Sequence, residues 1–326
     1  MLRRLVPDRF TISLLLTLLL ATLFPAKGSA ARIFDHVAQG AIGLLFFLHG
    51  ARLSRQAALA GLAHWRLHLL VLVCTFVLYP VLGLLLQPVA SRFLSPDLAR
   101  GVLFLCAVPS TVQSSIAFTA VGRGNVPAAL SSASASNLLG VFLTPAIAGL
   151  LLGTRAGGGV GLGAVMGIVA QILVPFLLGQ ALQDWVGPWV RKRAYFAGFV
   201  DKGVILLVVY TAFSASVLEG LWSELPVAVL LGLLLVCLLL LGLGLGLVRA
   251  GAKLGGFGRE DEVAIVFCGS QKSLVAGAPM ANILFAGQSI GLLLLPLMLY
   301  HQVQLLAAVG IARRYARGES GEGSEA

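Results

Sequence analysis

Apolar runs of membrane-span length recur along this 326-residue chain, and they restrict its fold more than any other feature. Short stretches of charged residues, glycine or proline separate one run from the next. The runs lie at residues 10–24, 34–50, 67–87, 99–121, 127–152, 159–183, 197–218, 225–248, 263–285 and 289–312. A helix needs about 20 apolar residues to cross a bilayer. The pattern therefore predicts an all-α polytopic membrane protein with ten transmembrane helices.

The charged residues agree with this prediction. Only 11% of the residues are charged and 58% are hydrophobic, which excludes a soluble globular domain. The net charge of +10 does not predict a nucleic-acid partner, because the basic residues lie in loops. One set of loops, together with both termini, carries most of the lysines and arginines; the loop residues are Arg52, Arg55, Arg66, Arg123, Arg191, Lys192, Arg193, Arg249, Lys253 and Arg259. The positive-inside rule then places both termini on the cytoplasmic side of the cell (inner) membrane.

The first run has a second interpretation. Arg3 and Arg4, the apolar run and Gly28-Ser29-Ala30 together have the pattern of a secretory signal with a cleavage site. We favour a membrane span, because removing this run would leave an odd number of helices.

Lys272 is the residue whose placement in a bilayer costs the most free energy, since it lies beside Gln271 in the middle of an apolar run. An ionisable side chain at the bilayer centre costs about 2.5–3.5 kcal/mol on insertion scales, so it usually marks a site. The competing interpretation is a structural lysine that snorkels. The helix breakers Gly269 and Pro279 flank it, which predicts a broken helix with exposed backbone groups.

An internal repeat is indicated by two matching pairs of spans. The fourth span contains Pro109 and the fifth Pro145, whereas the ninth contains the Lys272 segment and the tenth Pro296. Splitting ten spans after the fifth gives halves of opposite orientation. We predict a first five-span repeat at residues 1–153, an inverted repeat at 154–314 and a disordered cytoplasmic tail at 315–326.

Polar side chains near the two broken spans are the candidate site residues. Half-helix ends leave backbone groups without partners, and these suit ions and anionic groups. The candidates are Ser110, Gln113, Ser114, Ser115, Ser132, Ser136, Asn137, Ser270, Gln271, Lys272 and Ser273, with helix breaks at Pro109, Gly269 and Pro279. For Ser132, Ser136 and Asn137, close helix packing is an open alternative.

Other polar and small residues receive structural interpretations. Gly242-Leu-Gly-Leu-Gly-Leu247 predicts a close helix contact. Asp201, beside Lys202, is the deepest carboxylate, and an ion pair at the edge of a span accounts for it. Clustered intramembrane carboxylates are lacking, so no enzyme is predicted. The cysteines are interpreted as small apolar residues, at Cys74, Cys106, Cys237 and Cys268.

Several motifs together resemble one family. They are Pro109-Ser-Thr-Val-Gln-Ser-Ser115, Arg123-Gly-Asn125, Ser134-Ala-Ser-Asn-Leu-Leu-Gly-Val-Phe-Leu-Thr-Pro145, Phe267-Cys-Gly-Ser-Gln-Lys-Ser273 and Phe47-Leu-His-Gly50. Over essentially the whole chain they resemble the bile acid:sodium symporter family, and within it the sodium-bile-acid-symporter-like branch. The resemblance implies two inverted five-helix repeats, arranged as a panel domain (spans one, two, six and seven) and a core domain. Broken spans four and nine would cross in the core, and an organic anion such as a bile salt would be carried by alternating access.

The resemblance also implies sodium ligands, which this chain keeps only in part. Matching positions that retain a side-chain oxygen are Thr75, Ser114, Ser115 and Gln271. The family's other ligand positions carry non-matching residues, namely Ala129, Ala133, Phe267 in place of a carboxylate and Lys272 in place of an asparagine. A hard cation prefers oxygen ligands that include carboxylates, so this set is weakened.

Lys272 therefore leads to a hypothesis: its ammonium group stands in for a bound cation and attracts an anionic substrate directly. Three alternatives follow, namely a sodium-coupled symporter, a sodium-independent or proton-coupled carrier with Lys272 as fixed cation, and a membrane regulator of ion (calcium) homeostasis. The last rests on the link of vertebrate relatives of the branch to calcium handling. The expected partners are a small organic anion and the lipid bilayer. No cofactor is expected, and sodium is the ion that the resemblance implies.

Overall fold

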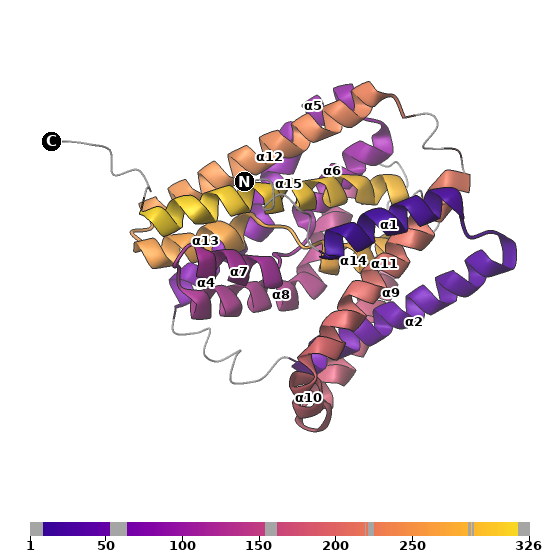
Figure 1. Cartoon of the computed structure of the whole chain (residues 1–326), viewed down its shortest axis with the longest axis horizontal. Coiled ribbons are helices and arrows are strands. Elements are labelled where there is room, and N and C mark those ends of the chain that lie inside the picture. The colour runs from indigo at the N-terminus through magenta and orange to yellow at the C-terminus, as the bar shows by residue number, and fades with distance from the viewer. Residues whose placement is uncertain are drawn as a thin grey trace. The chain divides into compact units, whose positions relative to one another are not determined.

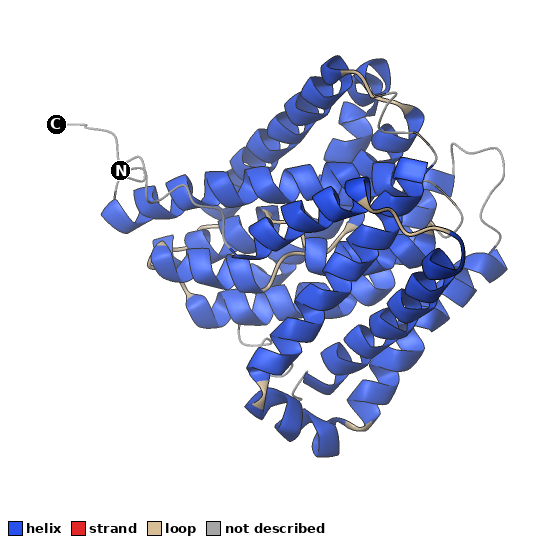
Figure 2. Ribbon diagram, turned by 45° about the vertical axis from the view of Figure 1, so that its right-hand side comes forward, coloured by secondary structure: helices blue, strands red, loops and turns tan. Residues whose placement is uncertain are grey.

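The computed structural model describes residues 9–52, 64–153, 162–218, 220, 225–285, 288 and 290–318. Within these ranges the regular structure is helical and contains no strand (Figure 2). The all-α prediction is therefore confirmed for this part of the chain. The last helix continues to Arg317, past the predicted start of the tail at residue 315, and residues 319–326 lie outside the described ranges.

Seven helical segments of the described chain are long and apolar enough to cross a membrane. They are Gly28–Arg52, Trp65–Phe93, Val126–Leu152, Gly198–Leu218, Val227–Leu254, Arg259–Leu284 and Ile290–Arg317. Two further apolar segments, Ile12–Leu23 and Ile172–Ala181, are shorter. The predicted fourth span is divided into two short helices. A multi-span helical architecture is thus observed, but ten spans in two inverted repeats are not confirmed.

The chain divides into two compact units. The first comprises Met1–Ser54, Val160–Leu230 and Val275–Leu295. Its helices are α1 (Arg9–Leu23), α2 (Gly28–Arg52), α9 (Leu162–Ala181), α10 (Gln183–Lys192), α11 (Ala194–Leu218) and most of α14 (Leu274–Leu284). Within this unit α2 lies along α9, α1 lies along α11, and α10 packs at one end of α2 (Figure 1).

Two glycines explain why α2 and α9 approach so closely. A Cβ atom at Gly50 would overlap the Phe176 carbonyl, and one at Gly179 would overlap the Phe47 carbonyl. The contact is thus reciprocal, with each glycine accommodating the backbone of the other helix. Small residues at helix contacts allow such close packing in membranes. The segment Phe47–Gly50 therefore has a packing role in this unit.

The second unit comprises Arg55–Gly159, Leu231–Leu274 and Pro296–Ala326. Its elements are α4 (Trp65–Val73), the π-helical turn η2 (Cys74–Leu78), α5 (Tyr79–Phe93), α6 (Pro96–Ala107), α7 (Gln113–Val121), α8 (Val126–Gly153), α13 (Arg259–Ser270) and most of α12 (Val227–Leu254) and α15 (Ile290–Arg317). Small side chains such as Ala129, Ala133 and Ala264 dominate the core between α4, α8, α12 and α13. All four cysteines of the chain are buried and form no disulfide.

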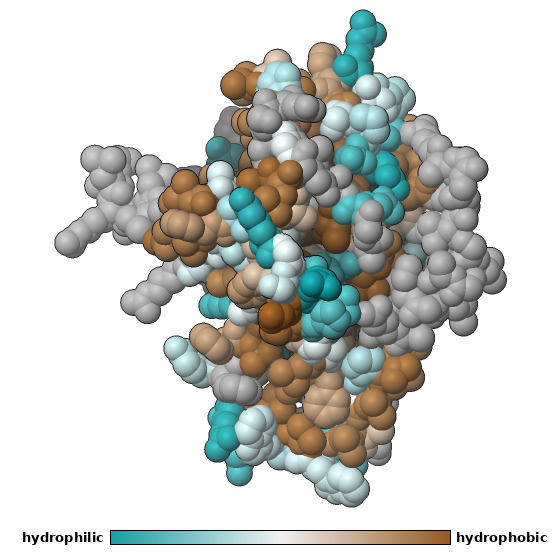
Figure 3. Space-filling view, turned by 90° about the vertical axis from the view of Figure 1, so that its right-hand side faces the viewer, coloured by the Kyte–Doolittle hydropathy of each residue, from teal (hydrophilic) through white to brown (hydrophobic). Residues whose placement is uncertain are grey.

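Large apolar side chains also cover the outside of the helices. Leu19, Leu85, Leu150 and Leu231 are each more than half exposed. Figure 3 shows apolar side chains at the surface of one face. Apolar surface on this scale is a liability in water, but it is the normal covering of helices that contact lipid.

Candidate ion and substrate site at two helix breaks

Two helix breaks meet within the second unit. The first separates α6 from α7 at residues 108–112, and the second separates α13 from α14 at residues 271–273. The Ser273 backbone N–H donates a 2.9 Å hydrogen bond to the Pro109 carbonyl. Val108 is extended (ψ 152°), as expected for a residue that precedes a proline. The two predicted breaks therefore exist and contact each other.

Two of the predicted helix breakers lie away from the second break. Gly269 belongs to the last turn of α13, and Pro279 lies inside α14. A Cβ atom at Gly269 would come within 3.0 Å of Val248 and 3.3 Å of Cys74, so this glycine serves close packing. The prediction that Gly269 and Pro279 interrupt the helix is therefore wrong. The interruption falls instead on Gln271, Lys272 and Ser273.

Side chains of α8 satisfy the backbone of the first break. The Ser136 hydroxyl accepts from the Ser110 N–H at 3.1 Å, and Asn137 Nδ2 donates to the Ser110 carbonyl at 2.7 Å. The Thr144 hydroxyl donates to the Ala107 carbonyl at 2.9 Å. Buried backbone groups must find partners when a helix ends inside a protein. Ser136 and Asn137 thus position the break, beyond simple helix packing.

Side chains of α5 and α15 satisfy the second break. The Tyr79 and Tyr300 hydroxyls donate to the Ser270 carbonyl at 2.8 and 3.1 Å. The amide of Gln304 accepts from the Lys272 N–H at 2.8 Å and donates to the Lys272 carbonyl at 2.9 Å. Sequence reasoning missed these three residues. The signal that could have found Gln304 is a polar side chain inside an apolar run.

Glycine makes room for one of these tyrosines. A Cβ atom at Gly244 of α12 would overlap the Tyr79 hydroxyl, whereas Gly242 and Gly246 face open space. The close contact predicted for Gly242–Leu247 therefore exists, but it depends on Gly244. The contact supports the site, because it places the Tyr79 hydroxyl against the second break.

The Lys272 side chain is completely buried and its ammonium group is enclosed by backbone oxygens. Nζ donates to the carbonyls of Thr75 at 2.8 Å, Cys106 at 3.0 Å and Val108 at 3.0 Å. It also lies 4.4 Å from the centroid of the Tyr79 ring, within the range of a cation–π contact. An ammonium group has three donors and no acceptor, so the three carbonyls use its full capacity.

Local sequence explains why these carbonyls are free to bind Lys272. In η2 the Tyr79 N–H bonds the Cys74 carbonyl, so it no longer reaches Thr75 as it would in an α-helix. The next residue, Pro80, has no N–H to offer. Cys106 and Val108 lie at the first break. Their carbonyls lose α-helical partners there, and the Ser110 N–H is already bonded to Ser136.

Hydroxyl groups of the first break surround the Gln271 side chain, which is 2% exposed. Gln271 Oε1 accepts from Thr111 at 2.7 Å, Ser114 at 2.6 Å and Ser115 at 3.1 Å. Its Nε2 is buried without a hydrogen-bond partner. The predicted group of Ser114, Ser115 and Gln271 is thus brought together, and Thr111 joins it.

The remaining sodium positions implied by the resemblance hold apolar or occupied groups. Phe267 is buried, with its ring centroid 5.7 Å from that of Phe118. Ala129 and Ala133 lie in the apolar core. The Thr75 hydroxyl donates to the Val71 carbonyl at 2.8 Å, so Thr75 turns its carbonyl, not its hydroxyl, to Lys272. The resemblance implies a sodium site with a carboxylate ligand at these positions. In this chain the ammonium group of Lys272 lies there instead.

The side chains of three other candidate residues make separate contacts or are exposed. The Ser132 hydroxyl is 2.6 Å from His68 Nδ1. Gln113 is exposed at the start of α7, and the Ser270 hydroxyl donates to the Val266 carbonyl at 2.6 Å. Ser132 and Gln113 are therefore not brought to the point where the breaks meet.

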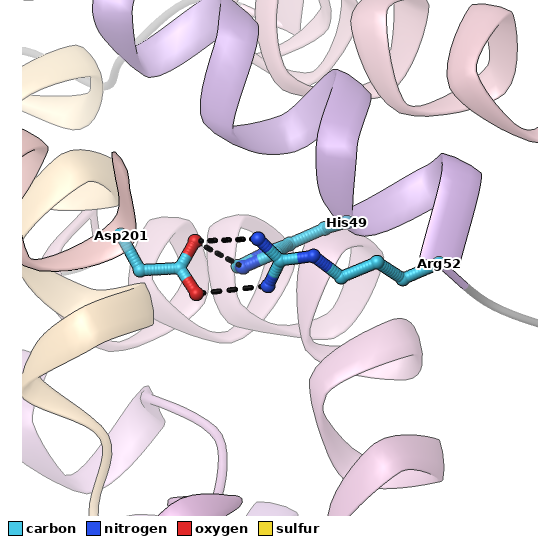
Figure 4. A network of polar contacts seen from close by, with 3 residues as sticks. All are labelled: His49, Arg52 and Asp201. Carbon is cyan, nitrogen blue, oxygen red and sulfur yellow. Dashed lines mark hydrogen bonds and ion pairs between the residues drawn. The ribbon is translucent and has the colours of Figure 1, made fainter. Parts of the chain in front are cut away.

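Two buried carboxylates of the described chain form ion pairs. In the first unit, Asp201 accepts from Arg52 at 2.8 and 3.3 Å and lies 3.5 Å from His49 Nε2 (Figure 4). The ion pair expected at Asp201 thus exists, but its partners come from α2. In the second unit, Glu262 accepts from Arg249 at 2.9 Å and from the Tyr315 hydroxyl at 2.6 Å. Within the described residues, no group of three or more His, Cys, Asp and Glu side chains could hold a metal ion.

Known proteins are similar to this chain over nearly its full length. PA2026 of Pseudomonas aeruginosa is 56% identical over 96% of this chain and 94% of its own. "Putative symporter YfeH" of Escherichia coli (strain K12) is 47% identical over 95% of this chain and 93% of its own. Sodium/bile acid cotransporter 7-B of Xenopus laevis is 28% identical over 94% and 91%.

The family resemblance is confirmed over the whole site. The model of the SBF-like CPA transporter family matches residues 8–317, a range that includes both helix breaks and every side chain that holds them. This family consists of membrane transporters and not of enzymes. The chain belongs to the SBF-like CPA transporter family.

Proposed function

We propose that this protein is a secondary active carrier of an organic anion, and that Lys272 takes the place of a coupling sodium ion. Membership in the transporter family and the names of its relatives, symporter and sodium/bile acid cotransporter, support the carrier class. The carbonyl cage around Lys272 Nζ is the single observation that carries the role of the lysine.

The cage has the chemistry of a monovalent-cation site. Three carbonyl oxygens and the face of Tyr79 surround Nζ, and carbonyl oxygens are ligands of hard cations as well as acceptors for an ammonium. Since all three Nζ donors are used, the charged form of Lys272 matches its surroundings. A proton-releasing role would leave one of these carbonyls without a donor. The cage therefore favours a fixed cation over proton coupling.

The buried position of Lys272 changes the original hypothesis on one point. Because its three donors are engaged, Nζ has no free donor for a substrate. We assign the direct polar contact to Gln271, whose Nε2 is buried and without a partner. An amide N–H can donate to a carboxylate, sulfonate or sulfate oxygen. Lys272 then acts by adding positive potential nearby.

Gln271 also lines a small cavity of about 10 Å³ within the second unit. Its polar wall is formed by Ser270, Gln271 and Gln304, and its apolar wall includes Leu241 and Leu245. Such a volume holds about one water molecule, so the cavity must widen before a carboxylate or sulfate group can enter it. A pairing of amides with apolar side chains suits the polar end of an amphipathic anion.

Alternating access between a panel and a core domain is the transport cycle we propose. The first compact unit contains the segments that the family resemblance assigns to the panel, and the second contains both helix breaks. We further propose a cell-membrane location with both termini cytoplasmic, because the basic loops alternate along the chain as the positive-inside rule requires.

Uptake into proteoliposomes tests the proposal. Organic anions, including bile salts, are first screened for an upward shift of the unfolding temperature in sodium and in potassium buffer. For an anion that binds, we expect equal uptake in the two buffers. Uptake that rises steeply with sodium would refute the role of Lys272 without any substitution.

Substitutions add a second readout. Lys272→Gln should lower uptake by at least about tenfold, equivalent to about 1.4 kcal/mol of lost binding or transition-state free energy. Lys253→Gln, which changes an exposed lysine in the last turn of α12, is the matched control and should not change uptake. Full uptake by a folded Lys272→Gln protein contradicts the proposal.

A further inference from the structure

The short helix α10 in the first unit combines a buried apolar face with an exposed aromatic face. Val190 is 2% exposed and packs with Leu48, and Val186 and Val200 cover the same cluster. On the outside, Trp185 is 81% exposed. One face thus fixes α10 to the rest of the unit, and the other face leaves the Trp185 ring largely exposed.

Exposed basic and aromatic side chains continue from the end of α10 into α11. Lys192 and Arg193 are exposed, and Tyr195 is 91% exposed. The Arg193 guanidinium lies 4.6 Å from the centroid of the Trp189 ring, so a cation and an indole are held together. Asp184 is the one acidic residue between residues 183 and 195, and it occupies the first turn, away from the basic end.

The position of α10 along the chain sets its depth relative to a bilayer. It lies between the apolar segment Ile172–Ala181 and the membrane-length segment Gly198–Leu218. Figure 1 shows it at one end of α2 and α9. A short amphipathic helix between two apolar segments lies at the membrane surface, where tryptophan and tyrosine rings are favoured at the level of the headgroups.

We propose that α10 and the first turn of α11 form a binding surface for anionic phospholipid headgroups. Trp185, Trp189 and Tyr195 enter the boundary between headgroups and acyl chains, while Lys192 and Arg193 contact lipid phosphates. Charge complementarity selects this partner, because a basic cluster beside aromatic rings attracts anionic lipid surfaces. Guanidinium and ammonium groups are also the usual phosphate-binding groups of proteins. The surface anchors the first unit at one leaflet and is independent of the proposed substrate.

Quenching by brominated lipids tests this surface in the full-length protein. Trp65→Phe and Trp222→Phe leave Trp185 and Trp189 as the fluorescent residues. In bilayers of fixed composition, brominated phosphatidylglycerol should quench them more strongly than brominated phosphatidylcholine at the same mole fraction. Equal quenching by the two lipids would refute the headgroup selectivity. Absence of quenching by both would show that another surface, such as a second copy of the chain, covers α10, and this too would overturn the proposal.

Charge variants identify the groups responsible. Lys192→Gln and Arg193→Gln should each reduce the preference for phosphatidylglycerol by about fivefold at low salt. Arg313→Gln with Arg314→Gln, an exposed basic pair on α15, serves as the matched control and should leave the quenching unchanged. A preference that survives removal of Lys192 and Arg193 in a protein with an unchanged unfolding temperature would contradict the assignment.

Discussion

Replacing Lys272 by alanine should open a cation-binding cage at the point where the two helix breaks meet. The substitution removes Cγ, Cδ, Cε and Nζ but leaves the carbonyls of Thr75, Cys106 and Val108 in place. Within the described residues, Nζ is the one side-chain donor that bonds all three carbonyls. The vacated space has the shape of three methylene groups ending in an ammonium, which is the shape of propylammonium.

The expected loss of stability follows from the hydrogen bonds. A buried carbonyl left without a donor costs about 1–3 kcal/mol, so three carbonyls cost about 3–9 kcal/mol. The substitution also removes the cost of holding an ammonium in an apolar interior, which offsets several kcal/mol. We expect a net loss of about 3–5 kcal/mol, because the three unpaired carbonyls cost more than removal of the buried ammonium returns. A typical stability of about 5–15 kcal/mol allows the variant to fold.

Chemical rescue is the decisive assay. The unfolding temperature of Lys272→Ala is measured in nanodiscs against increasing propylammonium, with tetramethylammonium as the matched cation that cannot donate hydrogen bonds. A ligand at about 100 times its Kd restores about 2.7 kcal/mol. We expect propylammonium to raise the unfolding temperature of the variant by several degrees and to leave the parent protein unchanged.

Two outcomes would refute the reasoning. The first is a Lys272→Ala protein as stable as the parent without any added cation, since the carbonyls would then not depend on an ammonium. The second is equal stabilisation by tetramethylammonium, because that cation has charge but no N–H donors. Stabilisation by sodium in place of propylammonium would still show a cation cage, and it would connect the variant with the sodium sites of the family.

Two further predictions concern packing and ion pairing. Gly244→Ala should lower the unfolding temperature because its Cβ overlaps the Tyr79 hydroxyl, whereas Gly246→Ala, which faces open space, should be neutral or stabilising by up to about 1 kcal/mol. Equal stabilities would show that the Tyr79 contact is unimportant. Asp201→Asn should cost about 1–3 kcal/mol, because it leaves the partly buried Arg52 guanidinium without its carboxylate partner. An unchanged urea or thermal midpoint for this variant would exclude a stabilising ion pair.

Local sequence signals predicted the first break but not the partners of the second. Pro109 lacks an N–H and forces Val108 into an extended conformation, so the break at α6 can be recognised from one residue. Gln271 and Lys272 have no comparable local preference. Their backbone leaves the helix because Tyr79 and Gln304, from distant parts of the chain, bond the Ser270 and Lys272 backbone. Such tertiary contacts cannot be located from a single sequence.

The importance of Lys272 was predictable, but its orientation was not. The free-energy cost of placing a lysine in an apolar run marked Lys272 as a site residue. This cost is the same whether the ammonium faces a substrate or the backbone. The choice depends on which carbonyls lack partners. That is decided by the π-helical turn Cys74–Leu78, where Tyr79 bonds one residue further back and Pro80 donates nothing. The hypothesis that Lys272 attracts the anion directly considered only the charge of its ammonium group. It did not include the unpaired backbone carbonyls that bind this group.

A lysine in place of sodium would change the energetics of the proposed transport cycle. A sodium ion contributes energy because it binds on one side of the membrane and dissociates on the other. The Lys272 ammonium is covalently attached, so it can stabilise the meeting point of the breaks in every conformation but cannot transfer the energy of a gradient. A ligand shifts a conformational equilibrium only through differential affinity for the two states. In the proposed cycle, therefore, the substrate itself or a different ion must drive the change, and equal uptake in sodium and potassium is the direct consequence.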